Sequence, residues 1–335
     1  MKYRVLGRTG LKFSELGFGG HEYRRFLAPD HFPGKRKFEE PIGLDELLKT
    51  QHQRNELIER AIDVGINYFD TTLVEEAQSL GLALKAFGRR RDVYVSAAIV
   101  LPFRKLKESP QARWREMISE GVEERLRLLQ MSRIDLFNVM MPEENYSRDG
   151  LKITIEVLEQ MRNQDKIGWI GASSHEPRFL AELIRRCDCF DSVMVRYNYH
   201  LQEARDVLFP LCKALDVGIV VMKPFAWPYY GIPFMRFAPV ERKETYYTPA
   251  QVSLRWILNS PEVTTVVSSM NRLDELEENL ATVNKEDKID EEILKQCLQA
   301  AESPRVEEKL RKMLEDPAFD IRFYAEKALN GVKLV

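Results

Sequence analysis

Short apolar segments alternate along this chain with longer segments of helical periodicity. The short segments have the length and residue types of buried strands, and they are residues 16–20, 68–70, 93–97, 134–139, 169–172, 192–195, 218–222 and 264–267. The longer segments place apolar residues on one face of a helix, and they are residues 54–64, 113–129, 151–163, 177–186, 249–258 and 273–283. Eight strands with helices between them predict an α/β fold, a closed (β/α)8 TIM barrel.

The glycines that follow the first strand argue against a doubly wound sheet. Such a sheet usually carries G-x-G-x-x-G after its first strand, where the glycines let the backbone approach a pyrophosphate. The sequence here is GFGGHE, which has a different spacing. We therefore interpret this cluster as a tight strand exit.

Three segments lie outside the alternating pattern. Residues 3–14 predict a hairpin that turns at Arg8-Thr9-Gly10 and closes the barrel floor. Residues 22–50 form an insertion rich in proline and aromatic residues, and with residues 225–245 they are expected to cover the carboxyl-terminal mouth, either as a lid over an apolar pocket or as the core of an enlarged loop. A helical extension is expected over residues 286–335, after a barrel that spans residues 16–285 of a single domain.

Composition and charge are those of an ordinary soluble protein. Lys and Arg number 50 against 52 Asp and Glu, so no basic surplus indicates nucleic acid. The amino-terminal MKYRVLGRTG mixes charges with apolar residues, which favours neither a signal peptide nor a membrane anchor and predicts a cytoplasmic protein. The four cysteines include Cys187 and Cys189 but no paired C-x2-C framework, so free thiols are expected and no iron–sulfur cluster.

Four sequence segments carry a resemblance to a known family. YRVLGRTGLKFSELGFGG, ERAIDVGINYFDTT, GWIGASSHEP and RWILNSPEVTTVVSSMNRLDELEENL occur in this order between Tyr3 and Val283. In order and spacing they resemble the aldo-keto reductase family. The resemblance implies a (β/α)8 barrel, a nicotinamide dinucleotide and a small carbonyl or alcohol substrate.

The family's catalytic tetrad is only partly matched. The resemblance implies an Asp, a Tyr that donates a proton, a Lys that lowers the pKa of this Tyr, and a His that orients substrate. Asp70 matches the Asp, but Glu75 stands at the Tyr position, Ala98 at the Lys position and Met140 at the His position. The family mechanism therefore does not carry over unchanged, and we expect non-standard or reduced chemistry.

Other residues could supply the missing groups. Asp70 and Glu75 could share a proton, which would make Glu75 a general acid, and Lys223 could replace the missing cation. His21 or Tyr23 could orient or protonate a substrate. Glu75 and Lys223 could equally be solvated residues. No metal is expected, because the histidines show no mutual ligand spacing.

The cofactor positions of the family are matched better. Ser173 and Ser174 match one of the two polar groups that bind the nicotinamide carboxamide in the family. The other is usually a Gln, which Met194 replaces here, with Asn198 four residues later. The stacking aromatic residue is replaced by Met222 or Lys223.

At the adenine end, Glu278 and Asn279 match the family's base-contacting pair. A Lys or Arg pair usually binds the 2′-phosphate of NADP(H) in the family. The matching positions here are Ser269 and Glu275, and Arg272 is the nearby cation. A carboxylate that faces a phosphate is unfavourable, so the sequence favours NAD(H) over NADP(H).

These observations predict an NAD(P)(H)-dependent oxidoreductase. Two alternatives stay open. One is a pseudoenzyme that binds a nucleotide or metabolite as a sensor or partner. The other is a barrel lyase or isomerase in which Asp70 and Glu75 transfer protons without hydride. The sequence leaves the oligomeric state undefined.

Overall fold

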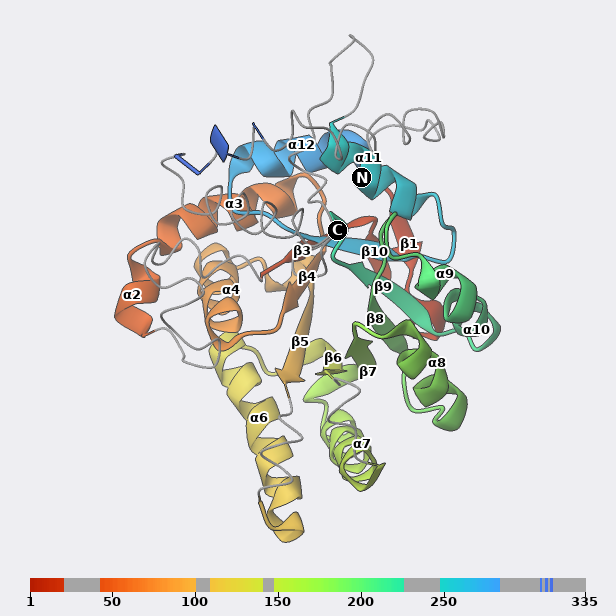
Figure 1. Ribbon diagram of the computed structural model, residues 1–335. Helices are drawn as coiled ribbons and strands as arrows, with labels where there is room; N and C mark the ends of the chain where they lie inside the picture. Colours follow the sequence, from red (N-terminus) through yellow and green to blue (C-terminus); the bar gives the residue numbers. More distant parts are fainter. Residues whose placement is uncertain are drawn as a thin grey trace.

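The fold is a closed barrel of eight parallel strands, as the sequence predicts. In the computed structural model, residues 1–20, 43–100, 109–140, 148–225 and 248–283 are described, together with residues 308, 311, 312, 314 and 315. The strands follow the order β10-β3-β4-β5-β6-β7-β8-β9 around the barrel (Figure 1). They are β3 (Leu16–Gly19), β4 (Tyr68–Thr71), β5 (Tyr94–Val100), β6 (Ile134–Met140), β7 (Ile167–Ser174), β8 (Ser192–Arg196), β9 (Gly218–Met222) and β10 (Thr265–Ser269).

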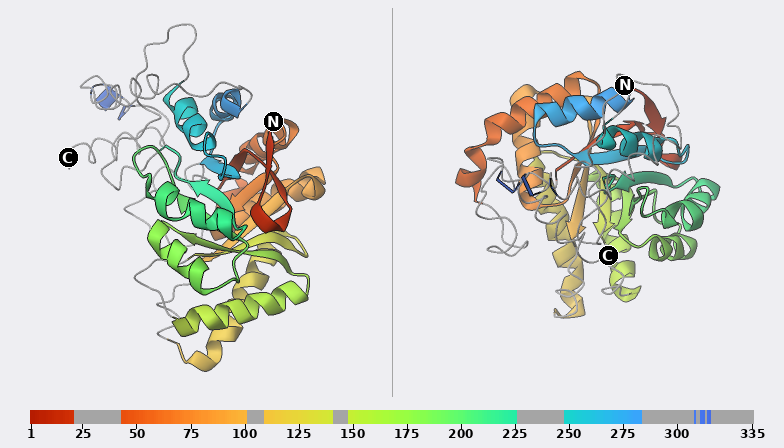
Figure 2. Two further views of the ribbon diagram at one scale, coloured as in Figure 1. Left: turned by 90° about the vertical axis from the view of Figure 1, so that its right-hand side faces the viewer. Right: turned by 45° about the horizontal axis from the view of Figure 1, so that its top comes forward.

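Helices surround this barrel in both orientations of Figure 2. They are α2 (Leu44–Leu48), α3 (Gln51–Asp63), α4 (Val74–Phe87), α6 (Trp114–Leu129), α7 (Arg148–Asn163), α8 (Pro177–Arg186), α9 (Glu203–Val207), α10 (Phe209–Ala214), α11 (Pro249–Leu258) and α12 (Leu273–Val283). The six predicted helices are present, each ending within three residues of its predicted bounds. None of the described helices is both long and apolar enough to span a membrane.

Local sequence signals explain where some helices begin and end. The Thr248 hydroxyl accepts a hydrogen bond from the Gln251 N–H, the Gln251 side chain accepts one from the Thr248 N–H, and Pro249 occupies the first turn of α11. Gly88 ends α4 in the left-handed region, with φ of 66°. The sequence does not predict α4 because buried polar and small residues such as Glu75, Glu76 and Gly81 blur its apolar stripe.

An amino-terminal hairpin closes the barrel floor, as predicted. Strands β1 (Tyr3–Val5) and β2 (Lys12–Ser14) pair antiparallel, and the turn contains η1 (Gly7–Thr9). Leu6 and Phe13 are completely buried in a cluster inside the barrel, and the ring centroids of Phe13 and Tyr68 lie 4.3 Å apart. The main core lies instead between the outer face of the barrel and the helices.

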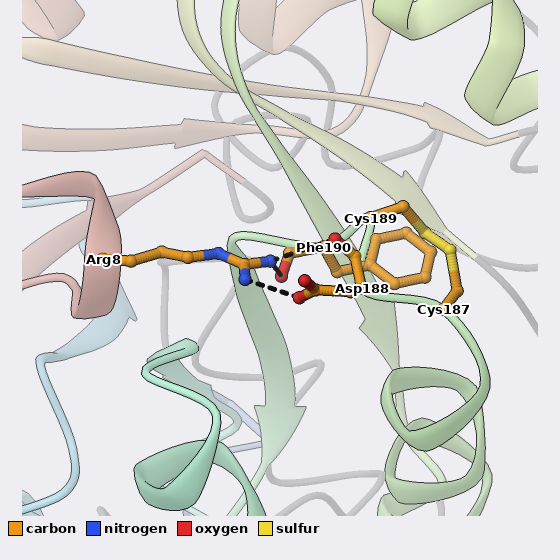
Figure 3. Close-up of a disulfide and its surroundings, with 5 residues drawn as sticks. All are labelled: Arg8, Cys187, Asp188, Cys189 and Phe190. Carbon is orange, nitrogen blue, oxygen red and sulfur yellow. Dashed lines mark hydrogen bonds and ion pairs between the residues drawn. A yellow bond between two sulfur atoms is a disulfide. The ribbon is translucent and has the colours of Figure 1, made fainter.

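The cysteines of the C-x-C pair form a disulfide, so the expectation of free thiols is wrong for them. Cys187 and Cys189 lie between α8 and β8, where the chain turns and brings their Cα atoms within 5.2 Å, a distance suited to a disulfide. Arg8 holds this turn, because it donates to Asp188 Oδ1 at 2.6 Å and to the Phe190 carbonyl at 2.8 Å (Figure 3). Cys212 is free and buried, as expected. Cys297 lies outside the described residues.

Most of the predicted mouth-covering segments lie outside the described residues. This holds for residues 21–42 and 226–247 and for nearly all of the predicted carboxyl-terminal extension. The last part of the predicted insertion contains α2, which the sequence did not predict. The lid stays a prediction.

Candidate functional site

Polar side chains on three adjacent strands form a hydrogen-bond chain inside the barrel. Asp70 on β4 lies opposite Ser96 on β5 in the strand register. The Ser96 hydroxyl donates to Asp70 Oδ1 at 3.0 Å, and Asn138 Nδ2 on β6 donates to Ser96 Oγ at 2.9 Å. Ser96 and Asn138 are completely buried, whereas Asp70 is half-buried. The strands β4, β5 and β6 that carry the chain are neighbours in Figure 1.

The surroundings of Asp70 favour its protonated form. Burial, and then the negative charge of Glu76, raise the pKa of Asp70 from 3.8 to about 7, although the Ser96 hydrogen bond and the Lys223 charge act in the opposite direction. Asp70 can therefore gain and lose a proton near neutral pH. This is the property that acid–base catalysis requires.

The raised pKa of Asp70 predicts a pH dependence of stability. Because the folded pKa of about 7 lies above the ordinary 3.8, the stabilisation from protonated Asp70 is complete below about pH 3.8 and is lost as pH rises through 7. Its size is at most about 4 kcal/mol. We expect the free energy of unfolding to fall between pH 5 and pH 9 less in Asp70→Asn than in the wild type. Equal slopes in urea titrations of the two proteins would contradict the assignment.

The two glutamates after Asp70 differ in role. Glu75 is completely buried in the first turn of α4, so the alternative that it is a solvated loop residue is wrong. Glu76 Oε2 accepts hydrogen bonds from the backbone N–H groups of Thr72 and Leu73, at 2.7 and 2.9 Å. Two such donors favour the charged carboxylate, and this is the charge that acts on Asp70. Sequence analysis assigned that role to Glu75.

Lys223 lies close enough to act on Asp70 electrostatically, and its role as a replacement cation stays a prediction. It follows β9 with φ of 60°, a left-handed conformation that is uncommon for a residue with a side chain. Asn198 Nδ2 donates to the Lys223 carbonyl at 3.0 Å, while Asn198 Oδ1 accepts from the N–H groups of His200 and Leu201. The Asn198 amide thus holds the backbone that presents Lys223.

The other tetrad positions lie at the ends of neighbouring strands. Ala98 is 2% exposed on β5, and Met140 is half-buried at the end of β6. The sequence analysis did not consider Arg125, a buried cation from α6 close to these strands. Its Nε donates to the Ala98 carbonyl at 3.2 Å and its Nη2 to the Thr72 carbonyl at 3.3 Å, and burial lowers its pKa. These contacts tie α6 to the ends of β4 and β5.

A second group of polar residues lies at the end of β7 and just after it. Ser173 and Ser174 end β7 and are 5% exposed, and Ser174 Oγ accepts from the Glu176 N–H at 3.2 Å. His175 beside them is kept neutral, because burial and then the charges of Lys223 and Arg196 lower its pKa to about 4. Sequence analysis placed His175 at a helix start, and α8 begins two residues later.

The residues expected at the adenine end gather around the start of α12. Arg272 is exposed and donates to both carboxylate oxygens of Asp274, at 2.9 and 2.6 Å. Glu275 Oε2 accepts from the Asn271 N–H at 2.8 Å, and Ser269 is half-buried at the end of β10.

Two amide oxygen atoms near the start of α12 are buried. Asn279 Nδ2 donates to Ser268 Oγ at 3.1 Å, whereas the Oδ1 atoms of Asn271 and Asn279 are buried without a hydrogen-bond partner among the described residues. Glu278 is half-buried on the same turn, and its carbonyl accepts from Gln251 Nε2 at 2.9 Å. Amide oxygens without a donor are suited to the amino group of an adenine.

Two predicted site residues, His21 and Tyr23, lie outside the described residues. Ser96 and Asn138 are placed by the structure but were missed by the sequence analysis. The alternation of a strand indicated both: Ser96 faces inward with Ala98, and Asn138 interrupts an apolar strand.

Comparisons with known proteins support the same fold. The model of the Aldo/keto reductase family matches residues 43–230 and 237–302. L-galactose dehydrogenase of Arabidopsis thaliana is 24% identical over 306 residues, which cover 84% of this chain and 88% of that protein. A probable voltage-gated potassium channel subunit beta, also of Arabidopsis thaliana, is 22% identical over 326 residues, covering 85% of this chain and 92% of that protein.

Solved structures share the architecture. The holo form of an aldo-keto reductase from Bacillus halodurans superposes with a TM-score of 0.65 at 23% identity, covering 90% of this chain and 96% of that chain. At this identity the likeness shows the fold alone.

Proposed function

Because the chain belongs to the aldo/keto reductase family, we propose that it binds a nicotinamide dinucleotide across the carboxyl-terminal mouth of its barrel. There it exchanges a hydride with a small carbonyl or alcohol substrate, and Asp70 serves as the acid–base group in place of the family's tyrosine. The observation that carries the proposal is the position of Asp70 inside the barrel, where Ser96 donates to its Oδ1 at 3.0 Å and where burial and the Glu76 charge raise its pKa to about 7.

Each group has a defined part in this reaction. The bound dinucleotide, when reduced, supplies the hydride. Protonated Asp70 gives its proton to the oxygen of the substrate carbonyl as that oxygen becomes negative, and in the reverse direction ionised Asp70 takes the proton of the alcohol. Lys223 adds a positive charge near the developing alkoxide. His21 and Tyr23 stay predictions for orienting the substrate.

The dinucleotide would be held at two places. Ser173 and Ser174 are suited to the nicotinamide carboxamide, because their hydroxyls can donate and accept. Glu278 and Asn279 are suited to the adenine. Asn198 acts indirectly, since its amide already holds the Lys223 backbone.

The proton-sharing pair is Asp70 with Glu76 in this proposal. Glu76 Oε2 accepts from two backbone N–H groups, and its charge favours the proton on Asp70. A general-acid role of Glu75, the alternative from the sequence, is separable by mutation. Glu75→Gln should leave turnover near the wild-type rate.

Nucleotide preference tests the cofactor part. Titration with NADH and NADPH, followed by nicotinamide fluorescence, should show NADH binding at least as tightly as NADPH, because Arg272 is engaged by Asp274 and Glu275 would face the phosphate. Glu275→Lys should improve NADPH binding about tenfold, which corresponds to about 1.4 kcal/mol. Glu275→Gln is the uncharged control. A failure of both nucleotides to bind would refute the proposal.

A second function is favoured by the three altered tetrad positions. Glu75, Ala98 and Met140 would let the barrel keep a nucleotide while turning over slowly, as in a binding partner or sensor. The similarity to a potassium channel subunit beta fits that class. Single-turnover mixing of the NADH complex with a substituted benzaldehyde separates the two, because a sensor shows binding without nicotinamide oxidation.

A further inference from the structure

The hydrogen-bond chain Asn138–Ser96–Asp70 has a direction. The nitrogen of the Asn138 amide can only donate, so Ser96 Oγ accepts from it at 2.9 Å. The Ser96 hydroxyl carries a single proton, which then points to Asp70 Oδ1 at 3.0 Å. Oδ1 is therefore an acceptor in both ionisation states of Asp70.

We propose that Asn138 and Ser96 are positioning residues that confine the exchangeable proton of Asp70 to its other oxygen, Oδ2. This inference rests on the proposed function and deepens it, since it names the atom that delivers the proton. A carboxyl group that could protonate on either oxygen would spend part of its time with the proton directed at Ser96. The chain removes that unproductive arrangement.

The barrel is built to accommodate the Asn138 amide. A Cβ atom at position 171 on β7 would lie 2.0 Å from Asn138 Oδ1 and 2.8 Å from Ser192 Oγ. Glycine at 171 therefore leaves the room that the amide occupies, and Gly171→Ala would displace the amide without altering any member of the chain.

Other charged and titratable groups face Asp70 and are unchanged in these variants. The charges of Glu76 from α4 and Lys223 after β9 act on the pKa of Asp70, and the charge of Asp70 acts on the pKa of Tyr68 on β4. Burial, and then the Asp70 charge, raise the pKa of Tyr68 well above its usual value, so Tyr68 stays neutral where Asp70 titrates.

The test follows the Asp70 carboxyl directly, without nucleotide. Infrared difference spectra of the full-length protein with 13C-labelled aspartate, referenced to Asp70→Asn, report the protonated carboxyl as a function of pH. Ser96→Ala should raise the midpoint by about one to two pH units, the size expected when a charged group loses a hydrogen bond. Asn138→Leu should raise it less, because the Ser96 hydroxyl can then turn and accept from the protonated carboxyl.

A matched control separates this effect from the loss of any buried hydroxyl. Ser192→Ala removes an equally buried hydroxyl on β8 that makes no hydrogen bond among the described residues, and it should leave the midpoint unchanged. Gly171→Ala should shift the midpoint in the same direction as Asn138→Leu. Because Gly171→Ala leaves Ser96 unchanged, its midpoint tests the inference even if the Ser96→Ala protein does not fold.

A kinetic readout completes the test. In the NADH complex, Asn138→Leu and Ser96→Ala should lower kcat by up to about 10²-fold with KM unchanged, as expected for a misplaced reacting group. Midpoints of Ser96→Ala and Gly171→Ala equal to those of the wild type and Ser192→Ala would overturn the inference. Shifted midpoints in a protein that binds no nucleotide would refute the proposed function and leave the positioning chain standing.

Discussion

Asp70→Asn lowers the rate of carbonyl reduction by about 10²–10⁴-fold, because the substitution removes the only proton source that we assign, and general acid catalysis contributes that much. Nucleotide affinity should change little, since Asp70 is not among the residues assigned to the dinucleotide. The measurement is single-turnover oxidation of bound NADH by an aldehyde, with binding followed separately by fluorescence.

The direction of the reaction gives this prediction a second signature. In the wild type, reduction requires protonated Asp70 and should decline as pH rises through about 7, whereas alcohol oxidation requires the carboxylate and should increase over the same range. Glu75→Gln is the matched control, a buried carboxylate five residues further on. If Glu75→Gln loses activity while Asp70→Asn keeps it, the acid is Glu75 and our assignment is wrong.

Ala98→Lys lowers the pH midpoint of carbonyl reduction by about one to three pH units. Ala98 follows Ser96 by two residues and faces the same side of β5, so a new ammonium group there lies near Asp70. An opposite charge within about 4–6 Å lowers the pKa of a carboxyl by about 1–3. Reduction at pH 7 should then slow, because less Asp70 is protonated, and alcohol oxidation should become faster.

The control for this variant is Ala98→Met, which adds a side chain of similar length without charge. Any effect of crowding in the barrel should appear in both variants, and only Ala98→Lys should shift the pH midpoint. If the two variants share one pH profile, the cation does not reach Asp70, and the electrostatic account of the site fails.

The sequence by itself determined the barrel, because eight strands that alternate with amphipathic helices leave few other ways to bury both faces of a parallel sheet. It also determined the floor hairpin, since Leu6 and Phe13 flank a turn signal. The alignment of FDTT with the second strand was sufficient to place Asp70 at the mouth.

Only the tertiary structure decided which groups meet Asp70. Asp70, Ser96 and Asn138 are far apart along the chain. The strand register places Asp70 opposite Ser96 and Asn138 opposite Ala98, and the Asn138 side chain then reaches Ser96. Sequence reasoning named Glu75 as the partner of Asp70 because this residue stands at the family's tyrosine position. The start of α4 selected Glu76, whose carboxylate accepts hydrogen bonds from the N–H groups of Thr72 and Leu73 just before the helix. The Cys187–Cys189 disulfide also depends on the tertiary structure, because the turn between α8 and β8 brings the two cysteines together and composition does not reveal that turn.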